Sequence, residues 1–453
     1  MKTAHRVSWP DGLAIPRRGC RRPGSSSIGI LAALLVCVGL AGCIRAANPS
    51  AKPSVPPSTT PSVLPSVTPS VLPSATATAT PSPTPIPTAT PRPTLPPTLT
   101  FVATGSMHTT RVDATATLLR NGKVLIAGGG SGRSGHNDVS SSAELYDPAT
   151  GKFTPTGSMT SARYNAMATL LPNGKVLIAG GVGCDDPKHC TDVDIGAFLD
   201  SAELYDPVTG RFTRTGSMTS VRDNEYAAAT LLPDGKVLIV GYSDWADVYD
   251  PSTGKFSRTM NTTVVNYDTA TLLPNGKVLV TGETVDNDGI VAQLYDESSG
   301  KFTNVLLALP PGKQTIHYSQ GQAIDRLWPE TATLLPDGRV LLFEGGYLET
   351  YDPASGKCTD GGYIAPAGSA YESWIANTAT LLADGDVLFT GEVSGSGTAT
   401  ALLYDPTDGL TRAGSILVGV DGQTTVLLPD GSVLIAGGGD SSNSLASAEL
   451  FKP

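Results

Sequence analysis

The sequence predicts an all-β fold, a seven-bladed β-propeller of four-stranded antiparallel blades, preceded by a disordered stalk rich in Pro, Ser and Thr. Two observations lead to this prediction. A unit of about 50 residues recurs seven times between residue 101 and the end of the chain. Before residue 100 the composition changes, because most of the 36 prolines lie there, whereas glycine is spread through the rest.

The first half of each unit predicts a β-hairpin, and it reads ATLLPNGKVLIAGG in its best copy. An Asn-Gly or Asp-Gly pair stands between two apolar runs, a pattern typical of a two-residue type I′ turn with positive φ at both residues. Both flanking strands are nearly all apolar, so we expect both to be buried on two faces. The seven pairs are Asn121-Gly122, Asn173-Gly174, Asp234-Gly235, Asn275-Gly276, Asp337-Gly338, Asp384-Gly385 and Asp430-Gly431.

The second half of each unit predicts two more strands joined by a tight turn, and it reads AELYDPATGKFTPTGSM in the first copy. Each unit thus has four strands, a to d, which make one propeller blade. The seventh copy reaches Pro453 without a strand d. Residues 101–107 read FVATGSM ahead of the first strand a, so we expect them to complete blade seven and close the ring.

These repeats resemble the kelch family, the propeller group that includes the central domain of galactose oxidase. The resemblance rests on the Tyr-Asp of strand c and on Gly-Gly pairs after strand b, and it covers residues 100–453. The Gly-Gly pairs are Gly128-Gly129, Gly180-Gly181 and Gly437-Gly438. The copper oxidases of this group use two Tyr, two His and a Cys linked to a Tyr, and this set is not evident here. The sequence leaves catalysis open, favours a protein that is not an enzyme, and identifies no catalytic residue.

The N-terminus predicts a lipoprotein signal peptide over residues 1–43. Four arginines between positions 17 and 22 precede an apolar run over residues 28–40. The sequence Leu40-Ala41-Gly42-Cys43 resembles a lipobox, so we expect lipidation at Cys43 and anchoring at the extracellular face of the cell membrane. An uncleaved anchor is the alternative, and it also leaves the body outside. Residues 44–99 are the expected disordered linker, because frequent proline removes backbone donors and few apolar side chains are present.

The charge distribution restricts the partners of the body. The net charge is −10, and residues 1–100 hold nine Lys or Arg and one acidic residue, so they carry +8 and the remainder carries −18. A body this acidic repels phosphate backbones and anionic headgroups, which argues against nucleic acid. We expect a monomer that meets the membrane only through its lipid anchor, with a glycan or an extracellular protein as its ligand.

The loops at one end of the blades form the expected working face. The a–b and c–d turns are short and uniform, whereas the b–c and d–a loops are long and variable, and function on a repeat scaffold usually lies on variable loops. Aromatic candidates there are Trp245, Trp328, Trp374, Tyr226, Tyr267 and Tyr371. Carboxylates that replace glycine after strand b are Glu283, Glu344 and Glu392, and Asp421 is one of several in nearby d–a loops. Arginine candidates are Arg111, Arg163 and Arg222.

Each of these candidates also has a structural interpretation. The aromatic rings could pack the loops onto the blades, the carboxylates could be solvated loop charges, and the arginines could pair with loop carboxylates across neighbouring blades. The functional interpretation is a binding module for a glycan or a protein. Its alternatives are a carbohydrate-active enzyme that uses loop carboxylates, and a structural or adhesive surface protein.

The longest b–c insertion contains two cysteines, Cys184 and Cys190. Outside the membrane we expect them to form a disulfide. A metal site that uses the two thiols with Asp185, Asp186 and His189 is the weaker alternative. No cofactor is expected, and no metal ligand is assigned. Only the run Asp286-Asn287-Asp288-Gly289 faintly resembles a calcium loop, and it lacks the longer ligand spacing.

Overall fold

The computed structural model describes the body of the chain, which belongs to a compact unit, Ile86–Pro453. The described ranges are residues 99–131, 138–186, 197–221, 227–241, 245–261, 264–284, 290–305, 331–344, 347–363, 374–393, 399–416, 419, 421–439 and 443–453. The predicted signal peptide, the lipidation site at Cys43 and nearly all of the stalk lie outside these ranges. None of the described segments forms a helix long and apolar enough to cross a membrane.

Seven four-stranded antiparallel sheets form the blades, as the sequence predicts. In strand order a to d, blades 1 to 3 are β2 (Thr115–Leu118), β3 (Val124–Ala127), β4 (Ala143–Asp147), β5 (Lys152–Pro155); β7 (Met167–Leu170), β8 (Val176–Ala179), β11 (Ala202–Asp206), β12 (Arg211–Arg214); β13 (Ala228–Leu231), β14 (Val237–Val240), β15 (Trp245–Asp250), β16 (Lys255–Asn261). Blades 4 and 5 are β17 (Val264–Leu272), β18 (Val278–Thr284), β19 (Ile290–Asp296), β20 (Lys301–Val305); β21 (Thr331–Leu334), β22 (Val340–Glu344), β23 (Tyr347–Asp352), β24 (Lys357–Tyr363). Blades 6 and 7 are β25 (Trp374–Leu381), β26 (Val387–Val393), β27 (Ala399–Asp405), β28 (Gly409–Ser415); β29 (Asp421–Leu427), β30 (Val433–Gly439), β31 (Ala448–Lys452), β1 (Thr100–Ala103).

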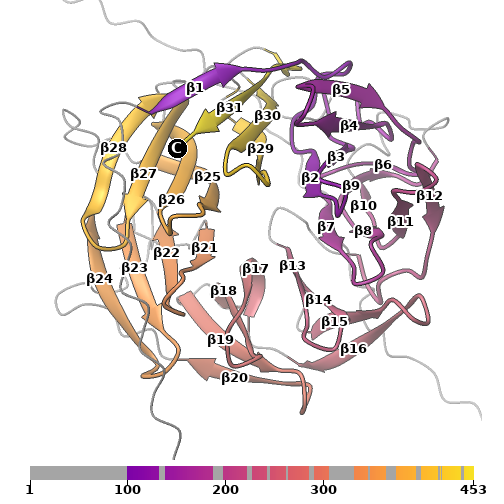
Figure 1. Cartoon of the computed structure of the whole chain (residues 1–453). Helices are drawn as coiled ribbons and strands as arrows, with labels where there is room; N and C mark the ends of the chain where they lie inside the picture. The colour runs from indigo at the N-terminus through magenta and orange to yellow at the C-terminus, as the bar shows by residue number, and fades with distance from the viewer. Residues whose placement is uncertain are drawn as a thin grey trace, which may run out of the picture. The chain divides into compact units, whose positions relative to one another are not determined.

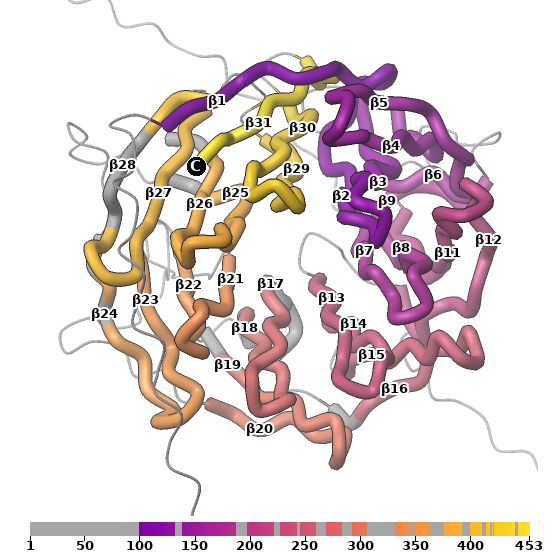
Figure 2. The backbone as a smooth tube through the Cα atoms, viewed as in Figure 1, coloured from indigo at the N-terminus to yellow at the C-terminus, as the bar shows by residue number. Residues whose placement is uncertain are grey.

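The blades form a closed ring with strand a of each blade innermost (Figure 1). Each strand a contacts that of the next blade, in the order β2, β7, β13, β17, β21, β25, β29 and back to β2. Among the described residues, the core divides into seven apolar clusters, one at each junction between neighbouring blades. The tube in Figure 2 shows the two ends of the ring meeting where β1 lies beside β31.

The strand that completes blade 7 comes from the N-terminal side of the propeller, which confirms the predicted closure. Strand β1 pairs antiparallel with β31, with Phe101 opposite Phe451 and ring centroids 5.5 Å apart. Thr100 pairs with Lys452, at the end of β31 where the other blades have their c–d turns. The chain therefore enters the propeller on the face of the short turns.

The a–b turns differ in type from the predicted type I′ turn, and that prediction is wrong. Only glycine has positive φ, as Gly122 does at 80°, whereas Asn121 does not. Gly122 N donates to Leu119 O at 3.0 Å and Leu119 N donates to Lys123 O at 2.8 Å, which makes a three-residue loop with glycine in the left-handed position. The Asn or Asp serves as an acceptor, because Asn121 Oδ1 binds the backbone N–H of Lys123 at 3.1 Å. The same bond recurs in all seven turns.

The Thr-Gly-Ser-Met sequence after strand d clamps one blade onto the next. The Thr156 hydroxyl lies 2.9 Å from the Tyr205 hydroxyl of the following blade, and Gly157 N donates to Gly210 O at 3.0 Å. Met159 is buried in the cluster between these blades. Equivalent hydroxyl pairs, each 2.9 Å apart, are Thr104 with Tyr146 and Thr215 with Tyr249. These clamps join blades 7, 1, 2 and 3 in sequence.

Candidate functional site

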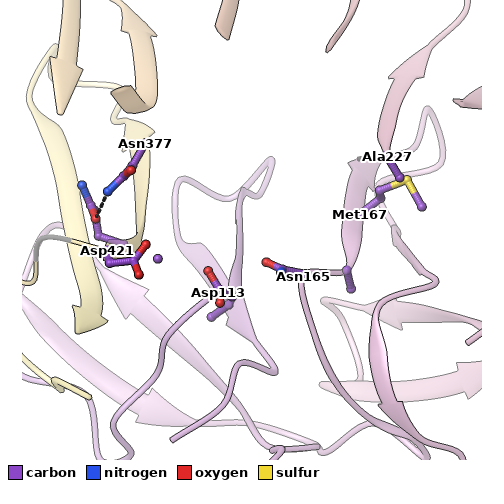
Figure 3. Close-up of a pocket in the computed structure, with 10 residues that line it drawn as sticks. Asp113, Asn165, Met167, Ala227, Asn377 and Asp421 are labelled. Atoms are coloured by element: carbon purple, nitrogen blue, oxygen red, sulfur yellow. Dashed lines mark hydrogen bonds between the residues drawn. The ribbon is translucent and has the colours of Figure 1, made fainter. Parts of the chain in front are cut away.

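A polar pocket of about 350 Å³ opens at the mouth of the central channel (Figure 3). Residues in the N-terminal half of strand a, or just before it, line the pocket in blades 1, 2, 3, 6 and 7. The pocket therefore lies at the d–a end of the channel. This is the face on which the sequence predicts function. The labelled lining residues are Asp113, Asn165, Met167, Ala227, Asn377 and Asp421.

Two of these residues adopt a left-handed backbone conformation, which is rare for residues other than glycine. Asp113 and Asn165 have φ of 55° and 50°, and no other described residue except glycine has positive φ. Such residues persist where the surrounding structure holds them. Here Asp113 N donates to Gly422 O at 2.8 Å and Asn165 N donates to Asp113 O at 2.9 Å, which links blades 7, 1 and 2. Both side chains point toward the pocket in Figure 3.

A pair of amides forms the wall contributed by blades 6 and 7. Asn377 Nδ2 donates to Gln423 Oε1 at 3.2 Å, and Gln423 Nε2 donates to the Thr390 hydroxyl at 3.1 Å. The Thr390 hydroxyl lies 2.6 Å from that of Thr378. Since Gln423 is 6% exposed and engages both ends of its amide, neither amide can flip alone without loss of a hydrogen bond.

The guanidinium of Arg111 binds groups inside blade 1. Its side chain is 1% exposed, and Nη2 lies 3.2 Å from Glu144 Oε1 on strand c. Nη1 donates to Gly128 O at 2.6 Å and to Ser142 O at 3.0 Å. Burial alone would raise the pKa of Glu144, but hydrogen bonds from His108 and the charge of Arg111 hold it below its ordinary value.

Arg163 repeats this arrangement in blade 2. Its buried guanidinium lies 3.6 Å from Glu203, donates to Ser201 O at 3.0 Å and also donates to Gly180 O. In both blades the partner carboxylate is on strand c of the same blade, not across a neighbouring blade as the structural interpretation supposed. Because both guanidinium groups are buried and bound inside their own blades, neither arginine is available to bind a ligand. Arg222 lies outside the described residues.

The loop passing over the Gly-Gly pair explains why those positions carry glycine. Gly129 N donates to Arg163 O at 2.9 Å, so the next blade's loop crosses directly above the end of strand b. A Cβ on Gly128 would collide with the same carbonyl oxygen. The kelch-like Gly-Gly pair is therefore an inter-blade contact, and Gly438 N likewise donates to Arg111 O at 2.8 Å.

Of the aromatic candidates, only Trp245 has a described side chain, and it is not among the residues that line the pocket. Trp245 begins β15, donates from Nε1 to the Thr219 hydroxyl at 3.2 Å, and carries the Arg258 guanidinium 3.9 Å from its ring centroid. The backbone places the remaining described candidates in strands: Tyr267 in β17, Trp374 in β25, and Glu283, Glu344 and Glu392 near the ends of β18, β22 and β26. Trp328, Tyr226 and Tyr371 lie outside the described residues.

The b–c insertion of blade 2 contributes β9 (Val182–Cys184) and β10 (Ala197–Phe198) to a small three-stranded sheet. Its third strand is β6 (Ala162–Tyr164), from the d–a loop before β7. Cys184 is disulfide-bonded. Cys190 and His189 lie outside the described residues, so their pairing and the alternative metal site stay predictions, as does the calcium-like run at residues 286–289. Within the described part of the chain, no cluster of three metal-binding side chains is present.

Four residues with polar side chains in the pocket lining were not named in the sequence analysis: Asp113, Asn165, Asn377 and Gln423. Alignment of the repeats on the glycine of the a–b turn would have found them. Asp113 and Asn165 take the same place in the repeat, and Asn377 and Gln423 occupy the next position in theirs. Asp421 was named among the loop carboxylates, and the structure brings it into the same pocket.

Comparison with known proteins agrees with this geometry. A kelch motif is recognised over residues 115–160, which span blade 1. The chain thus carries a kelch motif in blade 1 of a seven-bladed β-propeller. No curated protein sequence matches the chain.

Solved structures resemble this propeller at low sequence identity. A fungal alcohol oxidase of the AA5 family, in complex with copper, matches with a TM-score of 0.53 and 13% identity over 78% of this chain and 76% of that one. Virginiamycin B lyase from Staphylococcus aureus matches with a TM-score of 0.51 and 12% identity over 78% of this chain and all of that one. At these identities the likeness establishes the fold alone.

Proposed function

We propose that the kelch propeller is a binding module for an extracellular ligand, a glycan or a protein, held at the channel mouth. The observation that carries the proposal is the polar pocket itself, which collects side chains from five blades at the d–a end of the channel. Carboxylates and amides side by side supply several hydrogen-bonding groups in one recess, which is the usual make-up of a specific site.

The pocket is built to hold its shape before a ligand arrives. Backbone bonds fix the left-handed residues Asp113 and Asn165, and the Gln423 amide is engaged at both ends. Groups that are already ordered lose less conformational entropy on binding, so more of the interaction energy becomes affinity.

We also propose that the propeller is displayed at the cell surface through a lipid on Cys43. The entry of the chain at Thr100, on the short-turn face, supports this arrangement because the pocket opens on the opposite face. A Cys43→Ala variant is expected to appear in the culture medium, whereas the parent chain stays with the membrane fraction. Equal membrane retention of the two would contradict lipid anchoring.

The pocket is tested by binding of the full chain to printed glycans and to a panel of cell-surface and matrix proteins. Asn377→Ala and Asp421→Asn are each expected to lower the affinity for the captured ligand about tenfold, which is the effect of one lost hydrogen bond. Asp408→Asn is the matched control, because Asp408 lies on a c–d turn of the other face. Unchanged affinity in both pocket variants, or no ligand in either panel, would refute the proposal.

A further inference from the structure

The short-turn face of the propeller is nearly neutral, although the body as a whole is strongly acidic. This face consists of the seven a–b turns, the six c–d turns and the strand residues that flank them, together with Lys452 at the end of β31, and all of these residues are described. It holds 12 Lys or Arg and 13 Asp or Glu, so its net charge is −1.

The negative charge of the body therefore lies away from the short turns. Residues 101–453 carry −18, so the part outside the short-turn face carries −17, from 10 Lys or Arg against 27 Asp or Glu. Every Lys and Arg of residues 101–453 is in one of these two counts, so no other cation of the body remains to neutralise the surplus.

The described cations outside the short-turn face already have partners within the chain. The arginines with described side chains there are four. Arg111 and Arg163 are buried in ion pairs. Arg214 Nη2 lies 3.5 Å from Asp185 Oδ1, and the Arg258 guanidinium lies 3.9 Å from the centroid of an indole ring. These groups offer little attraction for an anionic ligand.

Carboxylates mark the end of the channel where the pocket opens. Asp113 and Asp421 line the pocket itself, and Figure 3 shows both at its edge. The bond from Asp113 N to Gly422 O, 2.8 Å long, holds these two aspartates together across the junction of blades 7 and 1. Three more carboxylates stand near the ends of strands b, on the same side of the ring: Glu283, Glu344 and Glu392.

The acidic surface is larger than the pocket, which indicates a large partner. A recess of about 350 Å³ is near the lower end of ligand pockets and suits one long side chain. A specific protein interface covers about 800 Å² on each partner, so it would use the pocket and the surface around it together. A surface of one sign also speeds the approach of an oppositely charged protein.

We propose that the pocket face binds a protein with a basic surface, which inserts a Lys or Arg side chain into the channel mouth toward Asp113 and Asp421. Hydrogen bonds from a cation to a carboxylate are about twice as strong as neutral ones. The inference rests on the proposed function and narrows its ligand, from a glycan or a protein to a basic protein.

The test prints each protein of the cell-surface and matrix panel in three forms: native, with acetylated lysines, and with arginines blocked by phenylglyoxal. The full chain is expected to capture native proteins of net positive charge and to lose them when their cations are blocked, because the inserted side chain is then changed. For the best capture, the association rate is expected to fall about tenfold or more between about 0.05 M and about 0.5 M NaCl, because salt screens the attraction.

Removal of two carboxylates separates the pocket from the general charge of the surface. Asp113→Asn combined with Asp421→Asn is expected to lower the affinity about a hundredfold, as two losses of about tenfold each. The variant should fold, because asparagine tolerates positive φ and Asn165 takes the same repeat position as Asp113. Asp384→Asn combined with Asp408→Asn is the matched control, since it removes two charges from the short-turn face and should leave the affinity unchanged.

Three outcomes would overturn the inference and leave the proposed function standing: pocket-dependent capture of glycans alone, pocket-dependent capture of neutral or acidic proteins, or capture that survives the blocking of both lysines and arginines. No capture at all, or capture that the double pocket variant weakens no more than the control does, would overturn both.

Discussion

The clamp between blades 1 and 2 makes a quantitative prediction about stability. The Thr156 hydroxyl lies 2.9 Å from the Tyr205 hydroxyl across the junction. Thr156→Val and Tyr205→Phe each remove one hydroxyl while keeping the shape of the side chain. The sequence already holds an apolar version of this pair, because Ala413 and Phe451 stand at the equivalent positions between blades 6 and 7.

The two single substitutions should not cost the same. Tyr205 is fully buried, and burial raises the pKa of its hydroxyl. Thr156→Val leaves that hydroxyl without its partner, at a cost of about 1–3 kcal/mol. Tyr205→Phe should cost only about 1 kcal/mol, because Thr156 Oγ1 keeps a 3.4 Å contact with Gly210 O. The double variant should cost less than the sum of the two by about 1 kcal/mol.

Equilibrium unfolding in urea measures these free energies, with equal m-values required for the comparison. Tyr351→Phe is the control, since the preceding blade has Val305 where blade 1 has Thr156. Tyr351→Phe should therefore be additive with Thr156→Val. Strict additivity of Thr156→Val and Tyr205→Phe would refute the clamp as an energetic contact.

Two further predictions concern the buried ion pair and the closing strand. Glu144 has a lowered pKa in the fold, so its contribution is present at neutral pH and is lost as pH falls below the ordinary carboxyl value of 4.5. Glu144→Gln should then lower the thermal midpoint at pH 7 and flatten its decline in acid, and a decline as steep as that of the parent chain would contradict the pairing. Phe101→Ala should cost about 2 kcal/mol, because Phe101 packs against Phe451, while Val102→Ala on the exposed side should cost under about 0.5 kcal/mol. Equal losses of unfolding free energy for the two variants, measured in urea, would contradict the packing of the closing strand through Phe101.

The fold could be predicted because its signals are local and repeated. Apolar runs and turn residues indicate the strands of each blade. The likeness of FVATGSM to FTPTGSM identifies it as the missing strand d of blade 7. The turn type could not be predicted from the dipeptide, because Asn-Gly fits two kinds of turn. In a type I′ turn both residues are left-handed, whereas in the three-residue loop only glycine is left-handed and asparagine accepts a hydrogen bond. Asn121 shows this, since its value to the turn is the bond to Lys123 N.

The pocket was harder to predict because no stretch of sequence contains it. Asn377 and Ala227 are 150 positions apart, and only the register of the repeats brings them to one recess. The sequence analysis selected large aromatic and charged residues instead, yet Arg111 and Arg163 form ion pairs with carboxylates inside their own blades. A buried arginine and a ligand-binding one are alike in sequence, because burial depends on which strand passes beside it.

Ring closure and the pocket depend on the same contacts. After β1, the Thr104 hydroxyl contacts the Tyr146 hydroxyl of blade 1. Further along, the backbone N–H of Arg111 donates to Leu445 O at 3.0 Å, and its carbonyl accepts from Gly438 N at 2.8 Å. Two residues later Asp113 N donates to Gly422 O at 2.8 Å and enters the pocket. These bonds join the first and last blades, so the wall that contains Asp113 and Asp421 exists only while the ring is closed. A variant that loosens β1, such as Phe101→Ala, should therefore lose ligand affinity in step with stability, although Phe101 does not line the pocket.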